Sequence, residues 1–413
     1  MLSAQSAVPT NAQLHGYAAL YKQELLENIL PFWLQHSPDW EHGGYFTCLN
    51  RQGEVFDTDK FIWLQGRQVW CFSTMYRQLE ANEQWKKMAL LGADFLEKYG
   101  HDEQGNWYFS LTAAGKPLIQ PYNIFSDCFA TMAFAALDTI IPTDKYKYLA
   151  INTFESIIAR QDNWKGQYNK AYPGTRPLKN FSLPMILCNL SLELEHLLGN
   201  SRVNEFIPQV IHQVMEVFYQ PRFGLILENV SPDGQFCNSF EGRLLNPGHA
   251  IEAMWFIMDL AQRLQDKTLL QRAVDLTITT LEYGWDKEHG GIFYFMDVLG
   301  QPPQQLEWDQ KLWWVHAEAL VALAKGFAFT GDIRCAQWFE KLHTYTWQHF
   351  KDPDYPEWFG YLNRQGQVLL PLKGGKWKGC FHVPRALYQV YNTLHHLPDT
   401  LIPNTAATTP AFA

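Results

Sequence analysis

The sequence lacks three features that would each place it in a particular class of protein. No apolar run reaches the roughly 20 residues that a membrane span needs, so we expect no membrane association. The seven cysteines include no Cys-x-x-Cys pair, and their odd number argues against a disulfide framework and against a thiolate metal site. Basic residues are outnumbered, with 33 Lys and Arg against 42 Asp and Glu, and the net charge of −9 speaks against nucleic acid as the main partner.

The two ends of the chain also lack recognisable signals. The first dozen residues have neither the charged nor the apolar region of a secretory signal, so we expect a cytoplasmic protein. We predict a disordered N-terminal tail over 1–14, a single catalytic domain over 15–398 and a flexible C-terminal tail over 399–413. Hydrophobic residues make up 47% of the chain, which is enough for an extensive core.

A unit of helix, hairpin and helix recurs six times. Apolar helical runs begin near six positions, separated by 60, 57, 65, 67 and 66 residues. Most are preceded by an aromatic stretch around a Gly turn, as in GGYFTCLNRQGEVF from Gly43 and GGIFYFMDVLGQP from Gly290, which is a hairpin signal. In the third unit that place holds QYNKAYPGTRPLKN, where we expect a loop. The runs begin near Arg67, Asp127, Pro184, His249, His316 and His382.

Six helix pairs can close into a ring, with inner helices around a central funnel and outer helices covering them. We therefore predict an all-α fold, an (α/α)6 toroid with short β-hairpins between helix pairs. Aromatic residues make up 15% of the chain, and most should fill the space between inner and outer helices. Three tryptophans lie next to polar clusters at helix entrances and are candidates to line the funnel: Trp63, Trp314 and Trp377.

Polar residues at the helix entrances are the candidates for chemistry. His249 and Glu252 are three residues apart, as are His382 and Arg385, so each pair can face inward together. His316 and Glu318 are about 200° apart around a helix, so both cannot face the funnel. Trp314 and Glu318 are four apart and can do so. We expect His316 to lie to the side of the funnel.

The ring places His249 in unit four and His382 in unit six, so the two imidazoles can approach a substrate from different sides. This arrangement suits removal of a proton from one face of a carbon next to a carbonyl and its return to the other face. Arg67 and Arg385 would stabilise the resulting oxyanion. No metal and no redox cofactor is required.

These residues carry a resemblance to a known family. The segments are QGRQVW from Gln65, KGQYNKAYPGTRPLKN from Lys165, NPGHAIEAMW from Asn246, WWVHAEAL from Trp313 and GCFHVPRALY from Gly379. Together they resemble the N-acylglucosamine 2-epimerase family, also called renin-binding protein, from about Tyr17 to Leu397.

The resemblance implies an isomerase that interconverts N-acetylglucosamine and N-acetylmannosamine by moving the C2 proton of the ring-opened sugar. By similarity, the essential residues are Arg67, His249, Glu318 and His382, supported by Glu252 and Arg385. His249 and His382 would flank C2, Arg67 would steady the enolate at O1, and Glu252 would orient His249.

The resemblance also implies an activating nucleotide, such as ATP, that is not consumed. The segment proposed to bind it combines four cations with two glycines that allow close approach to phosphate. A solvated basic loop is the alternative. The six residues are Lys165, Gly166, Lys170, Gly174, Arg176 and Lys179. Family members are commonly dimers, so we expect a homodimer.

Three alternatives stay open. Related cellobiose 2-epimerases and aldose–ketose isomerases tend to carry a histidine in the third unit, where this chain has Phe181-Ser-Leu-Pro-Met185, which favours the N-acyl branch. A glycoside hydrolase on the same toroid would use Glu252 and Glu318 as its carboxylates. A non-catalytic protein that binds a protease is the third.

Overall fold

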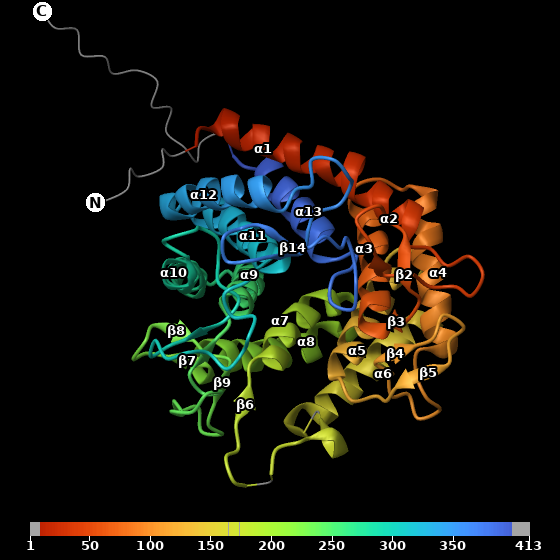
Figure 1. Ribbon diagram of the computed structural model, residues 1–413. Helices are drawn as coiled ribbons and strands as arrows, with labels where there is room; N and C mark the ends of the chain where they lie inside the picture. The colour runs from red at the N-terminus through yellow and green to blue at the C-terminus, as the bar shows by residue number, and fades with distance from the viewer. Residues whose placement is uncertain (1–8, 164, 173, 399–413) are drawn as a thin grey trace, which may run out of the picture.

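The computed structural model describes residues 9–163, 165–172 and 174–398. Helices alternate along the chain between an outer and an inner ring (Figure 1), and the predicted (α/α)6 toroid is confirmed. The inner helices are α3 (Ile62–Gln78), α5 (Ile124–Asp138), α7 (Ser182–Glu193), α9 (Pro247–Leu264), α11 (Trp313–Thr330) and α13 (His382–His395). The outer helices are α1 (Asn11–Gln23), α2 (Leu30–His36), α4 (Glu83–Tyr99), α6 (Asp144–Arg160), α8 (Glu195–His212), α10 (Lys267–Gly284) and α12 (Ile333–His349).

The two rings differ in how their helices are buried. Helix α11 is buried without interruption from Trp313 to Phe327, which is the behaviour of a helix that is apolar on all sides. Helix α4 buries one stripe, including Trp85, Met88 and Leu96, and exposes the rest. The inner helices therefore form the core, and the outer helices separate it from water.

The ring closes where the last inner helix meets the first. Helix α1 packs against α13, as the upper part of Figure 1 shows. The ring of Trp70 in α3 lies 5.3 Å from that of Phe381, the residue before α13. The Sγ atoms of Cys71 and Cys380 are 3.7 Å apart at the same junction. All seven cysteines are free thiols, six of them buried and Cys237 half-buried.

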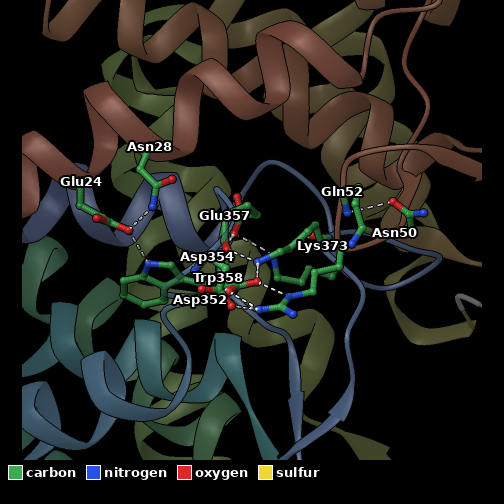
Figure 2. A network of polar contacts seen from close by, with 11 residues as sticks. Glu24, Asn28, Asn50, Gln52, Asp352, Asp354, Glu357, Trp358 and Lys373 are labelled. Carbon is green, nitrogen blue, oxygen red and sulfur yellow. Dashed lines mark hydrogen bonds and ion pairs between the residues drawn. The ribbon is translucent and has the colours of Figure 1, made fainter.

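A buried network of charges ties the beginning of the chain to its end (Figure 2). Lys378 donates to Glu357 at 2.8 Å, and Lys373 donates to Asp352 at 2.8 Å, with all four side chains almost or completely inaccessible. The indole of Trp33 in α2 also donates to Glu357, at 2.6 Å. The π-helical segment η1 (Glu24–Ile29) joins the same region, because Glu24 accepts from the indole of Trp358 at 2.9 Å.

The strands are short and connect the helix pairs. Five of their pairings are β1 (Cys48–Leu49) with β2 (Val55–Asp57), β3 (Lys60–Phe61) with β4 (Ser110–Leu111), β4 with β5 (Pro117–Ile119), β12 (Lys311–Leu312) with β13 (Tyr361–Leu362), and β13 with β14 (Val368–Leu370). Strand β7 (Tyr219–Gln220) pairs with β8 (Leu225–Ile226), and all these pairs are antiparallel. Strands β3 and β12 run directly into the inner helices α3 and α11, so their pairings hold the segments at which these two helices begin.

Two of the expected connections differ from the prediction. The stretch from Gly290 does not form a hairpin, because β11 (Met296–Asp297) pairs with β10 (Leu244–Leu245) from the preceding unit. The third-unit stretch, expected as a loop, contains the 3-10 turn η3 (Gly166–Tyr168) and the strand β6 (Lys179–Asn180), which pairs with β9 (Asn229–Val230). Both pairings join neighbouring units, which a pattern within one unit cannot reveal.

The N-terminal boundary also differs. Helix α1 begins at Asn11, inside the expected tail 1–14, because the Thr10 hydroxyl and the Gln13 side chain form a capping box. Residues 1–8 and the expected C-terminal tail 399–413 lie outside the described residues. Within the described ranges, no helix combines the length and the apolar character that crossing a bilayer requires.

Candidate active site

A cavity of about 550 Å³ opens where the inner helices begin. Its helical lining residues come from the first two turns of α3, α5, α7, α9, α11 and α13. The N-termini of the six inner helices therefore point toward the cavity, and their partial positive charges favour negative charge that develops there. Of the sequence candidates, seven line it: Trp63, Arg67, His249, Glu252, Trp314, Trp377 and His382.

His249 is fixed by the way α9 begins. Asn246 caps the helix by accepting from the backbone N–H of His249 at 3.2 Å. Gly248 lies so close to Trp314 that an added Cβ would approach the indole within 2.6 Å. A glycine is thus needed before His249 for the two rings to pack, with centroids 5.3 Å apart.

The carboxylate that orients His249 is Glu228, and the expectation that Glu252 does so is wrong. Glu228 Oε1 lies 2.8 Å from Nδ1 of His249, whereas Glu252 bonds Arg385. The backbone of Glu228 is held at both sides, because its N–H donates to Leu244 and its carbonyl accepts from Phe181. Its one trace in the sequence is a single acidic residue inside the apolar run LILENV from Leu225.

Glu318 lies behind His382, away from the cavity. Its Oε1 is 2.7 Å from Nδ1 of His382, and its Oε2 accepts from the indole of Trp255 at 2.8 Å. The guanidinium of Arg385 contacts both Glu318 and Glu252 through Nη2. Arg385 thus joins two carboxylates from different helices, and neither it nor Glu318 is part of the cavity wall.

Both catalytic candidates present the same nitrogen. A carboxylate can only accept a hydrogen bond, so Nδ1 of each imidazole must donate to its glutamate. This leaves Nε2 of His249 and of His382 for the substrate. Trp314 contacts both imidazoles, with centroid distances of 5.3 Å to His249 and 5.8 Å to His382.

The pKa values of the two imidazoles are shifted in opposite directions. Burial disfavours the charged form of His249, but the charge and the hydrogen bond of Glu228 outweigh it and raise its pKa. Burial and the positive charge of Arg67, followed by that of Arg385, lower the pKa of His382 well below its ordinary value. The first proton to bind this pair therefore resides on His249.

Arg67 is a buried cation that faces the cavity, and no carboxylate among the described residues forms an ion pair with it. Its guanidinium carbon lies 4.5 Å from the ring centroid of Trp63 and 4.0 Å from that of Phe129. Its Nε is buried and lacks a hydrogen-bond partner among the described residues. Burial lowers the pKa of Arg67 to about 9, so it stays charged at neutral pH and is available to an oxygen of the substrate.

Glu252, Glu318 and His382 hold three potential ligand atoms within 4.8 Å of one another, a spacing that a metal ion would accept. However, the guanidinium of Arg385 already contacts both carboxylates, and its positive charge would repel a metal ion there. The same arrangement does not suit a glycoside hydrolase, whose two carboxylates must flank a substrate at more than about 5 Å.

The remaining candidates lie elsewhere. His316 is completely buried between the carbonyl of Leu312 and the N–H of Ile292, outside the cavity. The expected nucleotide-binding residues lie between α6 and α7, and none lines the cavity. Of these six, Arg176 is exposed and lies 3.6 Å from Glu241. Cavity residues that the sequence reasoning missed include Phe125, Phe129, Ser182, Met185, Ile186, Tyr294, Glu307, Gln310, Leu312, Trp313 and Tyr361.

Comparison with solved structures identifies the same architecture. Cellobiose 2-epimerase from Bacillus thermoamylovorans B4167 superposes with a TM-score of 0.80 at 20% identity, over 91% of this chain and 99% of the other. A D-mannose isomerase gives a TM-score of 0.77 at 17% identity, over 91% and 98%. At these identities the likeness establishes the fold alone.

Sequence comparison establishes the family. The chain is 40% identical to N-acylglucosamine 2-epimerase of Bos taurus, over 93% of both chains, and 38% identical to that of Homo sapiens, over 88% of this chain and 86% of the other. The sequence pattern of the N-acylglucosamine 2-epimerase (GlcNAc 2-epimerase) family matches residues 44–386. This chain belongs to the N-acylglucosamine 2-epimerase family.

Proposed function

We propose that this protein is a sugar 2-epimerase that interconverts N-acetyl-D-glucosamine and N-acetyl-D-mannosamine in their open-chain forms. The observation that carries the proposal is the pair of imidazoles, each bonded through Nδ1 to a glutamate and each lining one cavity. Family membership supplies the substrate class.

The reaction needs one proton taken and one proton given. For one epimer, Nε2 of neutral His382 accepts the C2 proton, and the C–H electron pair moves into the C1 carbonyl. The enolate oxygen that forms lies against Arg67, whose buried charge stabilises it. Nε2 of protonated His249 then delivers a proton to the opposite face of C2. The other epimer follows the same steps in reverse.

The charges around the cavity match this protonation state. Glu228, Glu252 and Glu318 carry three negative charges, and Arg67 and Arg385 carry two positive charges. A single proton on the histidine pair makes the group neutral, which a buried site favours. That proton is the one the mechanism moves.

The test is turnover of N-acetylglucosamine in D2O, followed by NMR of C2 at early times. We expect N-acetylmannosamine with deuterium at C2, while the remaining substrate keeps its protium. A product that retains protium would contradict proton exchange through two bases. Parallel incubations with cellobiose and mannose distinguish the related branches, and faster turnover of either would replace the proposed substrate.

We also propose that a nucleotide binds between α6 and α7 as an activator that is not consumed. Lys170, Arg176 and Lys179 are exposed cations in that segment. ATP titration against Lys170→Ala/Lys179→Ala tests it, and activation unchanged in this variant would contradict it. We also propose that the protein is cytoplasmic and forms a homodimer. Light scattering, which measures the molar mass in solution, tests for the dimer.

A further inference from the structure

One wall of the active-site cavity is apolar, and the mechanism does not use it. Four apolar side chains and one hydroxyl form it, from the first two turns of α5 and α7. We call this set the α5–α7 wall: Phe125, Phe129, Ser182, Met185 and Ile186.

The rest of the lining differs, because it holds the charged and polar side chains beside several tryptophan and tyrosine rings. It carries His249, Glu252 and His382, with Glu307 and Gln310 also in the lining. Sugar hydroxyl groups need such polar partners, because a polar group buried without one is destabilised. The α5–α7 wall offers the single hydroxyl of Ser182, so it does not suit a ring of hydroxyl groups.

The wall adjoins the place where the reacting carbon must lie. The ring of Phe129 is 4.0 Å from the guanidinium carbon of Arg67, which faces the enolate oxygen in the proposed mechanism. Around the inner ring, α5 and α7 lie between α3, which carries Arg67, and α9, which carries His249. With O1 at Arg67 and C2 between the imidazoles, the nitrogen substituent of C2 has this wall beside it.

We propose that the α5–α7 wall is the subsite for the acyl group of a 2-acylamido sugar and that Met185 limits the length of that group. Met185 and Ile186 line the cavity although they are only 5% and 3% exposed, so most of each side chain packs inside the protein. Shortening either one opens space behind the wall. Ser182 is placed to bond the amide. This inference rests on the proposed epimerase function and adds the feature that selects its substrate.

The experiment compares N-acetylglucosamine with N-butanoylglucosamine in the wild type, in Met185→Ala and in Met88→Ala. Met88 is 2% exposed and lies on outer helix α4, away from the cavity, so it controls for the loss of a buried methionine. We expect the kcat/KM ratio of butanoyl to acetyl substrate to rise by roughly 10-fold or more in Met185→Ala, because methylene groups in an apolar pocket discriminate on this scale. Met88→Ala should keep the wild-type ratio. If Met185→Ala does not fold, Met185→Val takes its place in the same comparison of the two substrates.

Binding of the corresponding sugar alcohols, measured by calorimetry, separates the two proposals. If the wild type binds N-acetylglucosaminitol better than glucosaminitol, and Met185→Ala shifts preference to the butanoyl alcohol, the subsite stands even without turnover. Turnover with an unchanged acyl preference in a folded Met185 variant would overturn the subsite and leave the epimerase intact. Absence of both binding and turnover would overturn both.

Discussion

At the scale of single residues, the two imidazoles differ because the charges around them differ. No arginine within the described part of the chain forms an ion pair with Glu228, whose carboxylate bonds His249. Glu318 shares its charge between His382 and Arg385. The charge and the hydrogen bond of Glu228 therefore outweigh burial and raise the pKa of His249, whereas burial and the positive charges of Arg67 and Arg385 lower the pKa of His382.

Replacing Glu228 tests this difference. In Glu228→Gln the amide keeps an oxygen that can accept from His249 but loses the charge, so the pKa of His249 falls. Activity requires one proton on the pair, and that proton is lost on the high-pH side. We expect the high-pH limb of kcat/KM to move to lower pH, while the low-pH limb, set by His382, stays. A uniform loss of activity without a shift would contradict the role of Glu228.

Removing one imidazole should abolish proton exchange at one face of C2 and leave exchange at the other face. In His249→Gln, net epimerisation falls by about 10²- to 10⁴-fold, the usual contribution of a general acid or base. His382 remains, so the epimer that presents its C2 proton to His382 should still exchange it with D2O. His382→Gln should show the opposite epimer preference. NMR of each epimer in D2O measures this, and exchange of both epimers by either variant would argue against two bases.

At the scale of the helix, α11 serves structure on one side and the site on the other. Trp314 lines the cavity and Glu318 bonds His382 from behind, whereas His316 accepts from the Ile292 N–H and donates to Leu312, which holds the preceding loop. Burial lowers the pKa of His316 to about 3. It stays neutral when folded, while an unfolded histidine binds a proton below pH 6.5.

Acid should therefore destabilise the protein through His316. Between pH 6.5 and 3 the unfolded state binds more protons at this residue, so stability falls as pH falls, by about 2 kcal/mol at pH 5. His316→Gln should cost about 1–3 kcal/mol at pH 7 through its lost hydrogen bonds and should lose less stability between pH 7 and 5 than the wild type. Urea unfolding at both pH values measures this. His395→Gln, at an exposed position, is the control and should leave the slope unchanged.

At the scale of the whole molecule, the ring depends on joining segments more than 300 residues apart. The network of Figure 2 does so, with Glu24 and Trp358 separated by 334 positions. Lys378 belongs to the same network and lies four residues before His382. The network thus closes the ring and also fixes the segment from which His382 projects.

Lys378→Met should destabilise the fold by about 3–5 kcal/mol, because it leaves the buried Glu357 without its cation. Lys376→Met, two residues away and exposed, should cost little. Adding Glu357→Gln to Lys378→Met should recover part of the loss, which denaturant midpoints would report. Equal midpoints for Lys378→Met and the wild type would show that the network contributes nothing to closure.

The sequence by itself determined the repeat and therefore the ring. Apolar residues at helical spacing are a local signal, and they predict each helical run without knowledge of the others. The same local phase predicted that His249 and His382 stand at inner-helix entrances, and it placed His316 beside the funnel. The hairpin expected from Gly290 was wrong because its strand pairs with another unit.

Only the tertiary structure decided the partners of the catalytic candidates. Glu228 reaches His249 from a segment between two short strands, and Arg385 meets Glu252 across 133 positions of sequence. Spacing along one helix favoured Glu252 as the partner of His249, but closure of the ring brings Arg385 nearer to it. Protonation in the site is set by these contacts, since charge and burial act through space. The sequence located the two histidines, and the closed ring determined which of them holds the proton.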